Sequence, residues 1–172
     1  MKAFKTSDWI LAALMTVAGA FLMLENILAG PDAELAHPLS TQTWLMLPAF
    51  VLVTVPILWR RRNVLGATAV TVGMMGLHVL AFDWVTRCGV GLPLAFALGY
   101  AIARYAGSVR YQLAGLAGVA LLLIVTLVRD SSAGFEALVI AIPGVILFYG
   151  AGLLVQTLVS RKSAPAVERI AA

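Results

Sequence analysis

The sequence is poor in cysteine, histidine and charged side chains. Its 172 residues include one cysteine and two histidines, and only 12% are charged. A single cysteine, Cys88, excludes a disulfide within the chain and any zinc site built on cysteine pairs. Haem ligation by paired histidines within the membrane is also disfavoured, because only His78 falls inside a long apolar run. We therefore expect neither a metal nor a cofactor.

Sequence signatures of catalysis are also missing. The chain has no HExxH helix, no GxSxG turn, no P-loop and no pair of acids inside an apolar run. Ser108 follows Gly107, but no histidine on a later run is present to activate it, as a rhomboid-like protease would require. We expect a protein that is not an enzyme.

Hydrophobic residues dominate the chain instead, at 62%. A soluble domain of this size could not bury so much apolar surface. A helix needs about 20 apolar residues to cross a hydrocarbon core of about 30 Å. Six runs approach that length: 9–28, 43–59, 64–82, 90–106, 112–128 and 137–159. The sequence predicts an all-α, polytopic membrane protein, with one bundle of six transmembrane helices over residues 1–160 and a short cytoplasmic tail over 161–172.

The loops between these runs alternate in charge. Ten of the twelve basic residues fall on one side of the predicted bundle: Lys2, Lys5, Arg60, Arg61, Arg62, Arg104, Arg110, Arg161, Lys162 and Arg169. Six of the eight acids fall on the other side: Glu25, Asp32, Glu34, Asp83, Asp130 and Glu136. The positive-inside rule makes the basic side cytoplasmic, so both termini are expected there, in a bacterial cytoplasmic membrane. Topology explains the net charge of +4, and no nucleic-acid partner is expected.

The first run also matches part of a signal-peptide pattern. Lys2 and Lys5 would supply its basic region, and residues 18–20 (AGA) would supply a small-residue cleavage site. The apolar run continues to Leu24 and beyond, which is long enough to span a membrane. We expect it to be retained as the first transmembrane helix.

Small residues recur at every fourth position in the fourth run: Ala95, Gly99, Ala103 and Gly107. Helices in lipid associate largely by close packing through small side chains. We expect this stripe to pack against other helices of the same chain. A homodimer face is the alternative.

Four ionisable residues are the candidate ligand-binding or sensing site. Glu25 lies near the outer end of the first run and His78 lies within the third. Asp83 and Arg87 follow four residues apart, and would pair if the helix extended through them. Ionisable groups at membrane depth are costly and point to function by default. The alternatives are interfacial snorkelling for Glu25 and a packing role for His78, and a pH-sensing His78 is a further hypothesis.

Three segments carry a resemblance to a known family: residues 8–12 (DWILA), 56–62 (PILWRRR) and 93–105 (PLAFALGYAIARY). In this order they resemble the N-terminal membrane sensor domain of actinobacterial histidine kinases, which work with LuxR/NarL-type response regulators in two-component systems. The resemblance implies a six-helix sensory bundle. It implies no kinase activity here, because the phosphoacceptor histidine of that family has no counterpart after His78.

We therefore expect a sensory or regulatory membrane module that senses an envelope or membrane signal. It would act on a membrane or cytoplasmic partner, or on a second copy of itself, through its cytoplasmic side, and its small-molecule ligand is not specified by the sequence. The alternative is a small-molecule-binding transport component similar to energy-coupling-factor S subunits. Those subunits are also small six-helix proteins, and Ala12, Thr16 and Ala20 would match their small-residue patches. The third hypothesis is a structural or immunity-type membrane protein that binds no ligand.

Overall fold

The computed structural model describes residues 4–30 and 34–168, with side chains through 161. Over these residues the chain is helical and forms no extended strand. The elements are α1 (Thr6–Leu28), α2 (Met46–Thr54), the 3-10 helix η1 (Val55–Arg61), α3 (Val64–Phe82), α4 (Cys88–Tyr105), α5 (Val109–Leu127), the 3-10 helix η2 (Gly134–Ala137) and α6 (Leu138–Glu168). The all-α expectation is confirmed.

Five helical segments in the described residues are long and apolar enough to cross a membrane. They are Thr6–Leu28, Val64–Phe82, Cys88–Tyr105, Val109–Leu127 and Gly134–Arg161. Many of their large apolar side chains point outward, among them Leu80 and Val139, which are both 80% exposed. Water would penalise such a surface, whereas lipid tails do not. This surface therefore suits a helical bundle that is embedded in a membrane.

The predicted second span takes a different form from the other five. It consists of the nine-residue α2 followed directly by the seven-residue η1. Pro56 explains the change, because it has no N–H for the carbonyl four residues earlier and its ring clashes there. A 3-10 helix rises about 2.0 Å per residue against about 1.5 Å for an α-helix, so the two segments together advance about 28 Å. This length is close to the thickness of a hydrocarbon core.

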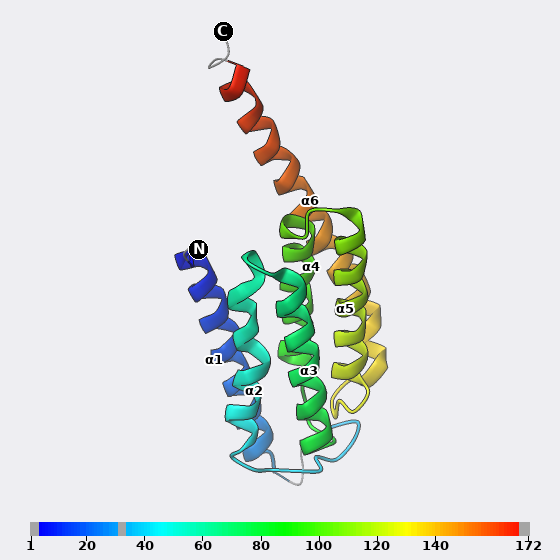
Figure 1. Ribbon diagram of the computed structural model, residues 1–172. Coiled ribbons are helices and arrows are strands. Elements are labelled where there is room, and N and C mark those ends of the chain that lie inside the picture. The colour runs from blue at the N-terminus through cyan, green and yellow to red at the C-terminus, as the bar shows by residue number, and fades with distance from the viewer. Residues whose placement is uncertain (1–3, 31–33, 169–172) are drawn as a thin grey trace.

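Successive long helices run in opposite directions (Figure 1). The start of α1, the end of η1 and the end of α6 therefore lie at the same end of the bundle, which we call the terminal end. The opposite end, formed by residues 34–45, 83–87 and 128–133, is the distal end. Helix α4 is central, since it contacts α6, α5, α1, α3 and η1. Its Leu94, Leu98 and Ile102 are completely buried.

The small-residue stripe of α4 packs against α6. Ala95, Gly99 and Ala103 are buried, and a Cβ on Gly99 would lie 3.5 Å from Cγ1 of Val145 in α6. Gly107 does not continue this stripe, contrary to expectation. Helix α4 ends at Tyr105, and Gly107 is exposed in the following turn with φ of +75°. Its role is to turn the chain, because only glycine adopts this conformation without strain.

Helix α6 is longer than its predicted span. It runs for 31 residues to Glu168, so residues 161–168 of the expected tail are helical. Pro165 does not end it, since a proline removes one backbone hydrogen bond rather than the whole ladder. The last part of α6 extends beyond the other helices at the terminal end (Figure 1).

Candidate functional site

Three loops meet at the distal end and are joined through their backbones. The N–H of Ser131 donates to the carbonyl of Val85 at 3.4 Å, and the N–H of His37 donates to the carbonyl of Ser131 at 3.1 Å. The N–H of Ser40 donates to the carbonyl of Trp84 at 2.9 Å. The ring of His37 also lies 4.1 Å from that of Trp84. The loops therefore form one layer over the helix ends.

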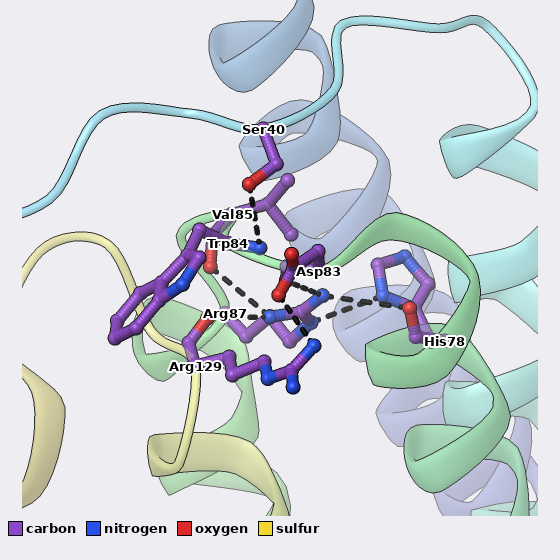
Figure 2. A network of polar contacts seen from close by, with 7 residues as sticks. All are labelled: Ser40, His78, Asp83, Trp84, Val85, Arg87 and Arg129. Atoms are coloured by element: carbon purple, nitrogen blue, oxygen red, sulfur yellow. Dashed lines mark hydrogen bonds and ion pairs between the residues drawn. The ribbon is translucent and has the colours of Figure 1, made fainter.

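Arg87 lies at the centre of this layer and is completely buried. Figure 2 shows its guanidinium between the end of α3 and the loop that follows α5. Its Nε donates to Nδ1 of His78 at 3.1 Å. Its Nη2 donates to the carbonyl of Asp83 at 2.7 Å, and its Nη1 donates to those of Arg129 at 2.8 Å and Val85 at 3.3 Å. A buried cation is thus held largely by backbone carbonyl oxygens of the loops around it.

Burial lowers the pKa of Arg87 to about 10, although the negative charges of Asp130 and Asp83 oppose this shift. The guanidinium therefore remains protonated at neutral pH. Its charge is buried without a direct ion pair in the described structure. Without these hydrogen bonds, burying the charge would cost much more free energy.

Asp130 is the second completely buried charge of the distal end. Its Oδ2 accepts from the backbone N–H groups of Arg87 at 2.6 Å and Cys88 at 2.7 Å. Its Oδ1 accepts from the N–H of Ser132 at 3.0 Å, the hydroxyl of Ser132 at 2.8 Å and the N–H of Ala133 at 3.1 Å. The carboxylate therefore caps the start of α4, where free N–H groups and the helix dipole favour a negative charge.

The pKa of Asp130 results from two opposed effects. Burial alone would raise it, but the hydrogen bonds from Arg87, Ser132, Ala133 and Cys88 outweigh burial, so the pKa lies below its ordinary value. The group is ionised at neutral pH. Together with Arg87 it forms what we call the distal network, which consists of His78, Asp83, Arg87, Arg129 and Asp130.

The structure brings together three of the four predicted site residues. His78, Asp83 and Arg87 all belong to the distal network. The helix does not extend through Asp83 and Arg87, which was the condition for their pairing, because α3 ends at Phe82 and Asp83 has φ of +51°. The Asp83 carboxylate instead pairs with Arg129 at 2.7 Å, and this pair is half exposed.

His78 is buried between aromatic rings. Its ring centroid lies 5.2 Å from that of Phe50 and 4.7 Å from that of Phe82. Because Nδ1 accepts a hydrogen bond from Arg87, the imidazole is neutral with its proton on Nε2. Protonating Nδ1 would break this bond and place two cations together. The geometry favours the packing role over the pH-sensing one.

Glu25, the fourth predicted residue, is exposed and lies apart from the distal network. It borders a pocket of about 220 Å³ lined by Leu22, Glu25, Asn26, Ala29, Leu35, Leu39 and Thr86. The pocket is nevertheless connected to the network through the backbone. The Asn26 amide donates to the carbonyl of Thr86 at 2.9 Å and accepts from its N–H at 3.0 Å, and Thr86 directly precedes Arg87.

The sequence interpretation missed Asp130 and Arg129 as members of the site. A local signal for Asp130 was present: an aspartate followed by two serines favours a turn in which the carboxylate binds backbone N–H groups. Its bond to Arg87 spans 43 residues and has no local signal. Cys88 is a free thiol, with its Sγ 3.1 Å from the hydroxyl of Ser132.

A smaller cluster of charges lies at the terminal end. Asp8, which is 1% exposed, pairs with Nε of Arg61 at 2.7 Å and with Nη2 of Arg60 at 3.0 Å. These pairs fasten the start of α1 to the end of η1. Among the described residues, no group of three His, Cys, Asp or Glu side chains is placed to hold a metal ion.

No protein-family model matches this chain, and comparison with curated proteins and with solved structures gives no significant match. The resemblance to histidine-kinase sensor domains thus remains a prediction from the sequence. The class that the structure defines is an apolar helical bundle suited to a membrane, with a buried ionic network at one end.

Proposed function

We propose that this chain is a membrane-embedded sensory or regulatory module. It receives a signal at the distal end and acts on a partner at the terminal end. The observation that carries the proposal is the course of α6. This helix begins just after the distal network and continues to Glu168, beyond the other helices at the terminal end (Figure 1).

The start of α6 is coupled to the distal network through a short segment. Asp130 binds α4 through the N–H of Arg87, and only residues 131–133 and η2 separate it from α6. A change in the position of Arg87 therefore alters the anchor of the loop that leads into α6.

Close packing transmits such a change along the bundle. A Cβ on Gly152 of α6 would lie 2.6 Å from the carbonyl oxygen of Tyr100 and 2.7 Å from Cβ of Ala103. Helices in such close contact shift as units, because packed interfaces have discrete arrangements rather than continuous ones. In this account α6 moves relative to α4 and carries its protruding end with it.

The pocket beside Glu25 is the proposed entry point of the signal. A ligand there would contact Asn26 and Thr86, and Thr86 precedes Arg87 in the chain. The carboxylate and the apolar lining favour a small solute with a cationic group. The volume of about 220 Å³ is below the range of about 300–1,000 Å³ that drug-sized ligands occupy.

The charge distribution supports six crossings, with the terminal end in the bacterial cytoplasm. Arg60, Arg61, Arg104 and Arg110 all lie at the terminal end, whereas the acids Glu25, Asp83, Asp130 and Glu136 lie toward the distal end. The partner is then a cytoplasmic protein, a membrane protein or a second copy of the chain. The resemblance to histidine-kinase sensor domains agrees with this arrangement.

A small-molecule-binding transport component, similar to energy-coupling-factor S subunits, is the second candidate. The pocket at the distal end favours it, because those proteins bind their ligand on the outer side. Native mass spectrometry of the purified chain separates the two candidates. A retained vitamin-like molecule supports transport, whereas a bound partner chain or dimer supports signalling.

A fusion protein tests the sensory proposal directly. Residues 1–168 are joined to the dimerisation and catalytic part of a histidine kinase of known activity, in four versions with junctions one residue apart to cover the helical phase. We expect Asp130→Asn and Glu25→Gln to change autophosphorylation in membrane vesicles. Leu80→Ala, a change at an 80% exposed residue of α3, should leave it unchanged. Equal activity of all variants at every junction would rule out transmission through α6.

A further inference from the structure

We propose that the terminal end holds a binding site for an anionic phospholipid, between η1 and α3. A groove with a volume of about 360 Å³ lies there, lined by Pro56, Trp59, Asn63, Gly66, Ala67 and Val70. The site is separate from the distal network, and its assignment does not depend on the proposed sensory function.

The walls of the groove suit an acyl chain. Five of the six lining residues are apolar or glycine, and Asn63 is the polar exception. Trp59 and Val70 are 43% and 48% exposed, so the groove opens on the outer surface of the bundle. A groove left unfilled in hydrocarbon would lose the dispersion contacts of its lining, and water does not fill apolar space at this depth. The tail of a neighbouring lipid is the occupant that this environment supplies.

The floor of the groove is shaped by the start of α3. Asn63 caps this helix, with its Oδ1 accepting from the N–H of Gly66 at 2.8 Å. A Cβ on Gly66 would lie 2.6 Å from Nδ2 of Asn63. Glycine at this position therefore allows the cap and keeps the groove open beside it.

The basic residues near the groove suit a negatively charged headgroup. Arg62 follows η1, and its Cζ lies 3.8 Å from the ring centroid of Phe4. The Phe4 ring in turn contacts that of Trp59 edge-on, with centroids 6.4 Å apart. The rings of Phe4 and Trp59 thus lie between the Arg62 guanidinium and the groove. Trp59 also marks this level as a membrane interface, because tryptophan is enriched there.

The neighbouring charges increase the positive potential. Arg60 and Arg61 share a single carboxylate, that of Asp8. Two guanidiniums on one carboxylate leave excess positive charge beside Arg62. Basic pockets at helix ends bind anionic headgroups, and guanidinium binds phosphate through paired hydrogen bonds. Charge complementarity therefore selects an anionic lipid rather than a zwitterionic one.

Native mass spectrometry of the full chain tests this site. The protein is purified in detergent with equal amounts of phosphatidylglycerol and phosphatidylcholine that carry the same acyl chains, and retained lipid is counted for each. Arg62→Gln removes the headgroup partner, and Val70→Phe fills the groove. Arg110→Gln removes an exposed cation at the other terminal-end turn, and Leu113→Phe enlarges a 62% exposed residue of α5. These two variants are the matched controls.

We expect preferential retention of phosphatidylglycerol by the native chain. Arg62→Gln should lower this preference about fivefold, since one basic residue near an anionic surface contributes about a factor of five. Raising the salt concentration should also lower the preference for phosphatidylglycerol, because salt screens the charges. Val70→Phe should reduce retention of both lipids, and both controls should behave like the native chain. Circular dichroism shows whether each variant is folded.

Two results would overturn the proposal. One is equal retention of the two lipids by the native chain. The other is a loss in Arg110→Gln as large as in Arg62→Gln, which would mean that phosphatidylglycerol responds to total charge rather than to a site.

Discussion

The carboxylate of Asp130 accepts a hydrogen bond from the backbone N–H of Arg87 at 2.6 Å, across 43 residues of sequence. This bond joins the loop before α6 to the first turn of α4. The side chain of Arg87 then binds His78 at the end of α3. One acid and one base thus connect three long helices, and both are completely buried.

Asp130→Asn should destabilise the protein by about 3 kcal/mol, because a hydrogen bond to a buried charged group contributes about 1.5–3 kcal/mol and several are weakened together. An amide keeps the size of the carboxylate but presents an NH2 group to donors on one side. Asp83→Asn is the control, since its half-exposed pair with Arg129 should contribute at most about 1 kcal/mol. Chemical unfolding in detergent measures both. Similar losses for the two variants would contradict the role given to Asp130.

The stability of the protein should fall in acid partly through Asp130. The pKa of Asp130 is lower in the folded protein than in the unfolded chain, where it is about 4. Its contribution is therefore complete above the unfolded value and is lost as the pH falls through the folded one. Unfolding free energy measured from pH 7 to pH 3 should decline less steeply in Asp130→Asn than in the native chain. Parallel curves would show that Asp130 does not contribute.

His78→Gln should flatten the pH dependence of stability between about pH 5 and 8, the range in which an unperturbed histidine titrates. Nδ1 accepts from the Arg87 cation, so the imidazole is neutral in the folded protein, whereas in the unfolded chain it takes up a proton as the pH falls. The native chain should therefore lose stability as the pH falls through this range, and His78→Gln should lose less. Stability itself should fall by about 1–2 kcal/mol through lost contacts with Phe50 and Phe82. A native chain that instead gains stability as the pH falls through this range would show that the folded imidazole binds a proton, and would restore the pH-sensing hypothesis.

The bundle was largely predictable from the sequence. The apolar runs predicted the helices because lipid imposes one length on every crossing, and α3 matches its predicted range of 64–82. The spacing of Gly99 and Ala103 predicted close packing, although not that α6 is the partner. The extension of α6 to Glu168 was missed because the apolar run, from which the span was predicted, ends at residue 159.

The distal network was only partly predictable. Apolar context marked His78, since an ionisable group at membrane depth is costly wherever the helix packs. Arg87 was marked by its spacing of four residues from Asp83. Which charges meet depends on helix adjacency, which periodicity does not encode. Asp130 was therefore placed correctly in a loop but not in the site, and Glu25 was grouped with residues that it does not contact.

Gly152→Ala should separate α4 from α6 and destabilise the protein by about 1–3 kcal/mol, the usual cost of overpacking. The added methyl would lie 2.6 Å from the carbonyl oxygen of Tyr100. Gly150→Ala is the matched control on the same helix, because nothing lies within 4 Å of its Cβ position. Unfolding of both variants in the same detergent gives the comparison. Equal stabilities would mean that this helix contact is looser than described.

The most direct test of the account is the position of the protruding end of α6. Spin labels are attached at Arg110→Cys and Arg161→Cys in a Cys88→Ser background, in which a hydroxyl replaces the thiol beside Ser132. Pulsed electron–electron double resonance in lipid nanodiscs then gives the distribution of distances between the two labels, once with the distal network intact and once with Asp130→Asn. We predict a shifted or broadened distribution in Asp130→Asn, and no change in Leu80→Ala. Superimposable distributions, with Asp130→Asn folded, would contradict coupling between the distal network and α6.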